Sequence, residues 1–380
     1  MQLRSNVNAT RVTSKTLIEW IKGLAAEADY TKCKLMTLRR VCVFTIACVA
    51  LIAPALVCAA GAPAPLAALQ LRLDLAATHA PGRVGIAVED LATGTISGVN
   101  ESASLPAAST IKIPVMVEVF RQMSLGRIDL NTRVHLLKSD RDWGWGDLAD
   151  APPGTVKNVK ALLWLMITDS DNTATNMLIR LVGRAHVNQT MARLGLRRTR
   201  LGDYIRSESD EIRYALRTSP RDMVKLLDEI AREKLIDAWS SREMLAILDG
   251  QTHNSLLPVP LPPDVKIAHK TGSLHDTLDD VGIVYGEQEP YIIAVLTTQL
   301  PDLELGRRFI RKVSRIAYDE LSHYAVRRVQ AGLPGFSIDR PLLAAPDALM
   351  WKVGPAASAV DPDSDSNQEP SPAVESPLGG

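Results

Sequence analysis

The chain has 380 residues, and its 43 Lys and Arg balance 43 Asp and Glu, so the formal net charge is zero. This balance gives no basic face for nucleic acid or for an anionic membrane surface. The seven histidines show no paired ligand spacing, so neither a metal ion nor another cofactor is expected.

The first 60 residues have the features of a leader rather than of a fold. Met36 is followed by a basic pair, by an apolar run over residues 41–57 and by small residues around Ala59 and Ala60. This pattern is typical of a secretory signal peptide over residues 36–60. We expect cleavage after it and a secreted, periplasmic protein without stable membrane insertion. A retained anchor is the alternative, and the true start, Met1 or Met36, stays open.

Cysteine usage agrees with a leader that is removed. All four cysteines precede residue 60, so the rest of the chain has neither disulfides nor thiol ligands. Cys58 suggests a lipoprotein site as an alternative, although Val57 before it is not a small residue. Residues 1–59 hold eight Lys and Arg against three Asp and Glu, which leaves the remainder at a formal charge of about −5.

The body of the chain begins and ends with strand patterns. Alternating apolar residues and a turn between them predict a hairpin over 83–90 and 95–100. Two further strands are predicted over 280–285 and 291–298, preceded by a short strand at 265–270. Helical spacing predicts helices over 66–78, 110–125, 159–167, 173–181, 219–232 and 303–329.

This order predicts an α+β fold. We expect an antiparallel sheet built from both chain ends, flanked by helices, with an inserted all-helical subdomain. One domain would span residues 61–335, and residues 336–380 would form a C-terminal extension. From about residue 354 that extension is rich in Pro, Ser and Asp and lacks aromatic residues, a composition that predicts disorder.

Three short strings in the body carry the chemistry. They are Ser109-Thr-Ile-Lys112, Ser170-Asp-Asn172 and Lys270-Thr-Gly-Ser273, separated by 61 and then 100 residues. A serine hydroxyl needs a base within hydrogen-bond reach to act as a nucleophile. Lys112 lies three residues after Ser109 on the same side of a helix, and the charge of Lys270 would depress its pKa. The strings together predict a serine acyl-transfer site at a cleft between subdomains.

Each string alone has an ordinary structural interpretation. Ser109 fits a helix cap, Ser170-Asp-Asn172 fits a cap or an Asx turn, and Lys270 fits a strand end. By chance, S-x-x-K appears about once in a chain of this length, and each of the other two about 0.1 times. The order and spacing of the three favour the functional interpretation. His269 points to the opposite face of its strand from Lys270, so we expect a structural role for it.

These strings resemble the signature of the class A β-lactamase and penicillin-binding-protein superfamily. The resemblance covers roughly residues 65–330. It includes the segment 166–176, Met-Ile-Thr-Asp-Ser-Asp-Asn-Thr-Ala-Thr-Asn, and the segment 194–201, which is similar to the approach to that family's omega loop. The resemblance implies an enzyme, a serine hydrolase that opens a small-molecule β-lactam, and it associates the protein with antibiotic resistance. A monomer is expected.

The resemblance also implies roles for individual residues. Ser109 would be the acylated nucleophile and Lys112 its base, while Ser170 would relay a proton to the leaving nitrogen. Lys270 would attract the substrate carboxylate and tune this network. These four form the expected catalytic set.

Three further residues are implied to bind substrate. Asn172 would bond the acylamide carbonyl, and Thr271 and Ser273 would hold the carboxylate. The backbone N–H groups of Ser109 and Ser273 would form the oxyanion hole. Trp143 or Trp145 lies where the family has an aromatic at the cleft mouth; ordinary packing is the alternative.

One departure from the family concerns deacylation. Ile205 stands where class A enzymes have the glutamate that aims the deacylating water, and Glu208 or Glu211 would have to replace it through a rearranged loop. The leading hypothesis is therefore an exported serine β-lactamase that works through a Ser109 acyl-enzyme. The alternatives are a D-Ala-D-Ala peptidase, an esterase or a slow penicillin-binding protein with poor deacylation, and a binding protein without turnover.

Overall fold

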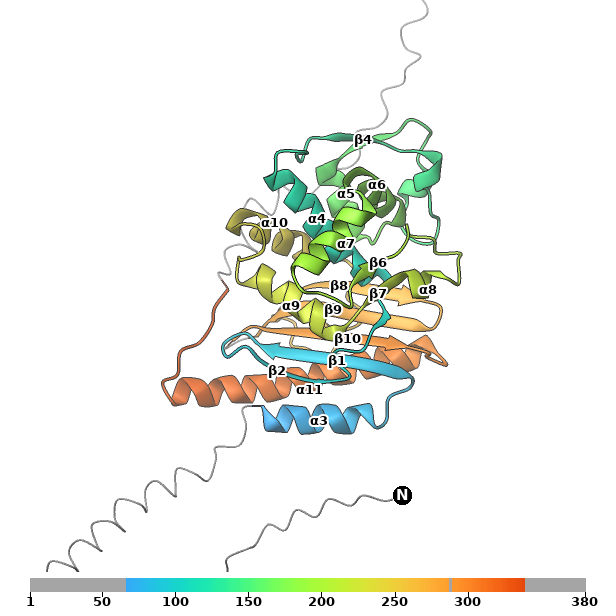
Figure 1. Ribbon diagram of the computed structural model, residues 1–380. Helices are drawn as coiled ribbons and strands as arrows, with labels where there is room; N and C mark the ends of the chain where they lie inside the picture. Colours follow the sequence, from blue (N-terminus) through green and yellow to red (C-terminus); the bar gives the residue numbers. More distant parts are fainter. Residues whose placement is uncertain (1–65, 287–288, 339–380) are drawn as a thin grey trace, which may run out of the picture. The chain divides into compact units, whose positions relative to one another are not determined.

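A five-stranded antiparallel sheet organises the computed structural model, which describes residues 66–286 and 289–338 (Figure 1). Its strands run in the order β2-β1-β10-β9-β8. Their bounds are β1 Arg83–Asp90, β2 Thr95–Val99, β8 Lys266–Leu274, β9 Thr277–Tyr285 and β10 Tyr291–Thr298. Arg83 pairs with Thr298, so the first strand lies beside the last. The predicted sheet from both chain ends is confirmed.

The alternation along β1 explains why both faces of the sheet are covered. Val84, Ile86 and Val88 belong to the apolar cluster on one face, and Ala87 belongs to the cluster on the other. Successive side chains of a strand point to opposite faces, so a strand buried on both faces must be apolar at nearly every position. All residues of β9 and β10 are accordingly buried.

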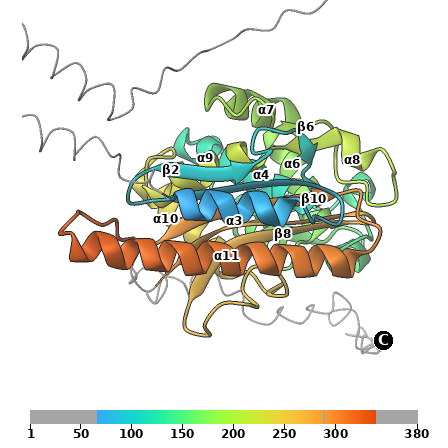
Figure 2. The same cartoon turned by 90° about the horizontal axis from the view of Figure 1, so that it is seen from below.

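Two helices cover the lower face of the sheet. Helix α3, Ala67–Ala77, and helix α11, Leu303–Gln330, lie side by side across it (Figure 2). They bury leucines of α3 and a Phe-Ile-Val row of α11 against the strands. Arg72 on α3 bonds Glu320 on α11 at 2.8 Å, a partly exposed pair that orients the two helices more than it stabilises them.

The remaining helices form the layer on the opposite face (Figure 1). They are α4 Lys112–Ser124, α5 Val159–Thr168, α6 Asn172–Val182, α7 Arg184–Arg193, α8 Ile212–Ala215, α9 Pro220–Ala231 and α10 Ala238–Asp249. Side-chain oxygens cap the N-termini of four of them, from Asn158, Asp171, Ser219 and Asp237. The inserted helical subdomain is thus confirmed. The sequence did not predict three helices of this layer, α7, α8 and α10.

Short elements connect the subdomains. Strands β3 Leu105–Pro106, β7 Leu216–Thr218 and β6 Arg200–Leu201 form a small sheet, and β4 Arg133–His135 pairs with β5 Val156–Asn158. Single 3₁₀ turns are η1 Ala108–Ile111, η2 Lys138–Asp140 and η3 Leu148–Asp150. Because β3 leads directly into η1 and pairs with β7, this small sheet fixes where the first of the three strings begins.

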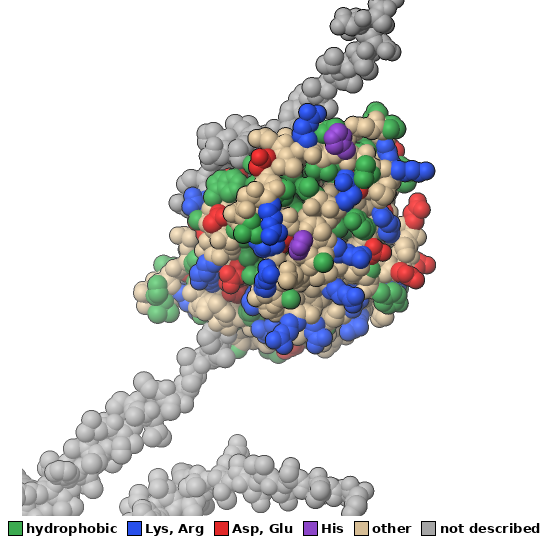
Figure 3. Space-filling view, turned by 45° about the horizontal axis from the view of Figure 1, so that its top comes forward, with side chains coloured by type: hydrophobic (Ala, Val, Ile, Leu, Met, Phe, Trp, Pro, Cys, Tyr) green, Lys and Arg blue, Asp and Glu red, His purple; other side chains and the backbone are tan. Residues whose placement is uncertain are grey.

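Within the described residues, no helix is long and apolar enough to cross a membrane. The signal peptide predicted at 36–60, the four cysteines and the predicted disordered tail lie outside these residues. Figure 3 shows basic, acidic and apolar side chains interspersed on one face of the molecule.

Candidate active site

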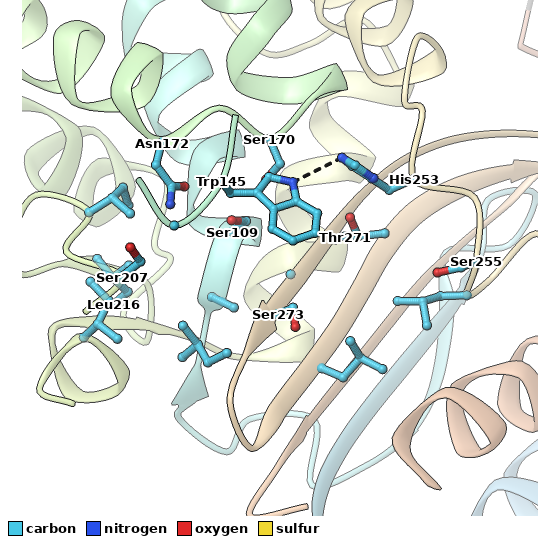
Figure 4. Close-up of a pocket in the computed structure, with 18 of the residues that line it drawn as sticks. Ser109, Trp145, Ser170, Asn172, Ser207, Leu216, His253, Ser255, Thr271 and Ser273 are labelled. Carbon is cyan, nitrogen blue, oxygen red and sulfur yellow. Dashed lines mark hydrogen bonds between the residues drawn. The ribbon is translucent and has the colours of Figure 1, made fainter. Parts of the chain in front are cut away.

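Ser109 lies in a 3₁₀ turn, whereas the sequence predicts it at the start of an α-helix over 110–125. The α-helix α4 starts at Lys112. In a 3₁₀ helix three residues make one turn, so Ser109 and Lys112 still lie on one side. Ala108 adopts a left-handed φ of 40°, a conformation that a non-glycine residue occupies at a cost of about 1–3 kcal/mol. This backbone turns the half-buried Ser109 toward the cleft (Figure 4).

The third string approaches the first through a glycine. A Cβ on residue 272 would lie 2.9 Å from the Ala108 Cβ and 3.1 Å from the Ser109 backbone nitrogen. Only glycine permits this approach of β8 to η1 without displacement. The contact places Ser273, the next residue of β8, beside the turn that carries Ser109.

The second string forms a strained turn before α6. Ser170 has a left-handed φ of 57°, and Asp171 after it caps α6 by accepting from Ala174 N at 2.7 Å. The other oxygen of Asp171 accepts from Leu148 N at 2.9 Å. The Asx-type cap that the sequence also suggested is therefore present. It holds the Ser170 hydroxyl toward the cleft.

Lys112 is fully buried and donates to three acceptors. Its Nζ bonds the backbone oxygen of Ser170 at 2.5 Å, Ser170 Oγ at 3.0 Å and Asn172 Oδ1 at 2.8 Å. The predicted base thus contacts the predicted relay and one predicted binding residue directly. Burial lowers the pKa of Lys112 well below its usual value, and the charge of Lys270 lowers it further, while Asp171 and Asp142 oppose both.

Lys270 reaches the same hydroxyl from the sheet. Its fully buried Nζ donates to Ser170 Oγ at 3.0 Å and to the backbone oxygen of Thr271 at 2.9 Å. Burial lowers the pKa of Lys270 to about 7, with Asp280 and Asp169 acting in the opposite direction. Burial thus lowers the pKa of both amines below the usual lysine value.

The three strings meet at a cleft of about 220 Å³ between the sheet and the helical subdomain (Figure 4). Of the predicted residues, Ser109, Ser170, Asn172, Thr271 and Ser273 line it. Lys112 and Lys270 do not line the cleft, since both lie beneath its floor. Lys270 is thus placed to act on a ligand by its charge rather than by open contact.

His269 stands on the other side of β8, as predicted. Its ring nitrogens lie 2.9 Å from Asp280 Oδ1 and 3.0 Å from Asn254 Oδ1. This buried pairing ties β8 to β9 and to the loop that follows α10, which is a structural role.

Besides one expected aromatic, the cleft has two residues that the sequence did not predict, His253 and Arg307. Trp145, one of the two expected aromatics, lines the cleft and donates from Nε1 to His253 Nε2 at 3.3 Å (Figure 4). Trp143 does not line the cleft. Arg307, near the N-terminus of α11, lines the wall, and its Nη1 donates to Glu304 Oε2 at 3.4 Å. No local pattern marks His253 or Arg307, because each reaches the cleft from an element far from the three strings.

The loop that should carry the deacylating carboxylate presents Ile205 to the cleft instead. Asn176 pins its backbone, since Ile205 N donates to Asn176 Oδ1 at 2.8 Å and Asn176 Nδ2 donates to Ile205 O at 3.0 Å. Glu208 and Glu211 are exposed and do not line the cleft. Among the described residues, no Asp or Glu contributes to the cleft wall.

A sheet from both chain ends, an inserted helical layer and a serine cleft above two buried lysines define a hydrolase of the β-lactamase kind. The model of the β-lactamase enzyme family matches residues 68–321, and the chain belongs to this family, in its class A branch.

Solved structures agree with this assignment. The chain is 31% identical to PBP-A, with a TM-score of 0.64 over 68% of this chain and 97% of that one. It is 30% identical to a β-lactamase from Sphaerobacter thermophilus, with a TM-score of 0.61 over 69% and 98%. It is 25% identical to a β-lactamase from Chitinophaga pinensis, with a TM-score of 0.61 over 67% and 99%.

Proposed function

We propose that the protein is an exported serine β-lactamase that opens the β-lactam amide through an acyl-enzyme on Ser109. The observation that carries the proposal is the contact of Lys112 and Lys270 with one hydroxyl, Ser170 Oγ, beneath the cleft that Ser109 lines. A neutral lysine beside a serine is the base that such a nucleophile requires.

In this mechanism neutral Lys112 takes the proton of Ser109 as its Oγ attacks the lactam carbonyl carbon. The backbone N–H groups of Ser109 and Ser273 stabilise the negative oxygen that forms. The proton then passes from Lys112 through Ser170 to the lactam nitrogen as the C–N bond breaks. Water hydrolyses the ester and returns the free serine.

Substrate recognition follows from the polar groups on the cleft wall. The hydroxyls of Thr271 and Ser273 and the guanidinium of Arg307 suit a carboxylate, with the charge of Lys270 beneath them. Asn172 has an amide N–H suited to an acylamide carbonyl. These groups support a small anionic amide as the substrate class.

The second candidate is a slow penicillin-binding protein or a D-Ala-D-Ala peptidase, with an esterase as a variant of it. The absence of an acid among the described cleft residues and the position of Ile205 favour it. A solved structure of a single-substitution mutant of PBP-A is that of its acyl-enzyme complex with penicillin G. Both candidates share acylation of Ser109 and differ in how long the adduct lasts.

Intact-mass spectrometry after mixing with penicillin G separates the candidates. An adduct that disappears as substrate is consumed supports the β-lactamase, and an adduct that persists for hours supports the penicillin-binding protein. No adduct at any time would overturn both.

Export is tested separately. N-terminal sequencing of protein from its native compartment should begin near Ala59 or Ala60. Material that retains residues 41–57 would show an anchored form.

A further inference from the structure

Asp142 is a buried carboxylate beside the cleft to which the predicted mechanism gives no role. It is 6% exposed and lies between η2 and η3. Its Oδ1 accepts from Asn172 Nδ2 at 2.7 Å, Ser207 Oγ at 2.7 Å and Gly144 N at 3.1 Å, and its Oδ2 accepts from Ser207 N at 2.7 Å. One side chain thereby joins Asn172 to the loop that presents Ile205.

The carboxylate determines which way the Asn172 amide faces. An ionised carboxylate only accepts hydrogen bonds, so the amide nitrogen must point toward Asp142. The amide oxygen then faces Lys112, whose Nζ donates to it at 2.8 Å. One of the two N–H bonds of Asn172 goes to Asp142, and the other remains for a ligand in the cleft that Asn172 lines. Without an anion at 142, nothing in this contact prevents the amide from flipping.

Asp142 also contributes to the electrostatics of Lys112. The charged groups that act on this amine are Lys270 from β8, Asp171 at the start of α6, and Asp142. Asp169 and Asp280 act in turn on Lys270. Burial and Lys270 lower the pKa of Lys112, while the two carboxylates raise it. Removing the charge of Asp142 should therefore lower this pKa further.

We propose that Asp142 is a positioning residue that orients the Asn172 amide between Lys112 and the acylamide group of the substrate. It also anchors the loop through Ser207, whose hydroxyl hydrogen is committed to the carboxylate and whose oxygen is left as an acceptor in the cleft. This inference rests on the proposed function, since it assumes acylation of Ser109 by a β-lactam.

The test is Asp142→Asn, which keeps the volume and removes the charge. We expect acylation by penicillin G to fall about 10²-fold, because a displaced contact in a reacting site costs that much. Acylation by a β-lactam without an acylamino side chain should slow less than acylation by penicillin G, since that substrate does not use the Asn172 N–H. In the pH profile of the acylation rate, the rising limb should move to lower pH. A merely structural role would lower the acylation rate with both substrates alike and leave the rising limb of the pH profile in place.

A matched control lies on the same loop. Asp150 is an exposed carboxylate that accepts from Trp143 Nε1 at 3.2 Å, and it makes no contact with Asn172. Asp150→Asn makes the same chemical change and should leave both the substrate ratio and the pH limb as in the parent. An equal effect of the two variants would overturn the proposal.

Because Asp142 accepts four hydrogen bonds, Asp142→Asn can fail to fold, and thermal unfolding checks this. In that case Asp142→Glu is the test variant, because it keeps the charge and moves the carboxylate by one methylene. It should slow acylation by penicillin G while keeping the parental pH limb, and an unchanged rate would contradict the proposed role. If the parent itself forms no adduct, the proposed function fails rather than the role of Asp142.

Discussion

The side-chain amines of Lys112 and Lys270 meet on one oxygen, since each lies 3.0 Å from Ser170 Oγ. Both amines donate to this hydroxyl, because its oxygen has two acceptor lone pairs besides one hydrogen of its own. Either amine can in turn accept that hydrogen when it is neutral. Ser170 therefore connects the two lysines, and we expect a proton to move along this connection.

Ser109→Ala should abolish both the covalent adduct and hydrolysis, because the attacking oxygen is removed. The fold should survive, since a half-buried hydroxyl on the cleft wall contributes little packing. Intact mass after penicillin G and the thermal midpoint measure the two properties. Full activity in this variant would end the assignment of Ser109.

Lys112→Met should slow acylation by about 10²–10⁴-fold, the contribution typical of a positioned base. Methionine nearly fills the space of the buried chain, so the loss reports the amine and not a cavity. Lys234→Met, at an exposed lysine, is the matched control and should behave as the parent. Stopped-flow acylation is the measurement, and a loss below about tenfold would argue against Lys112 as the base.

Lys270→Ala should move the rising limb of the acylation rate to higher pH. The charge of Lys270 lowers the pKa of Lys112, so its removal raises that pKa, and neutral Lys112 then appears only at higher pH. Binding of the anionic substrate should weaken as well. This direction is opposite to that expected for Asp142→Asn, so the two pH profiles check each other. A limb that stays in place would show that Lys270 does not tune Lys112.

Ile205→Glu should shorten the life of the acyl-enzyme by about 10²-fold or more, because it adds a general base on the cleft wall. The bonds to Asn176 hold the backbone of residue 205 and keep the new side chain directed at the cleft. Ile205→Gln is the uncharged control and should leave the lifetime of the adduct as in the parent. Single-turnover kinetics tests this, and a parent without a burst that turns over rapidly would show that another group already replaces the glutamate.

Glu208→Gln and Glu211→Gln should leave both acylation and deacylation unchanged. Both carboxylates are exposed and away from the cleft wall. Adduct accumulation in either variant, relative to the parent, would show that the loop rearranges to bring that acid inward. The ratio of burst amplitude to steady-state rate is the quantity to compare.

The sequence predicted the sheet and most helices because their signals are local. Alternation marks β1, a continuous apolar run marks β10, and caps such as Ser219 mark helix starts within a few residues. It placed Ser109 at the start of an α-helix over 110–125 rather than in a 3₁₀ turn, because 3.0 and 3.6 residues per turn are hard to distinguish over four residues. It missed α7, where Gly183 at a φ of 85° starts a new helix one residue after α6 ends.

By itself, the sequence determined which residue types occur and in which order, and for a serine, two lysines and an Asx turn that was enough to predict the chemistry. Only the tertiary structure decided which of them touch. It brought Ser170 between two lysines 58 and 100 residues away, set Asp142 against Asn172, and placed Arg307 in the cleft while leaving Glu208 outside. The reason is physical, because such contacts depend on how buried faces pack across the whole chain, and no local pattern encodes that packing.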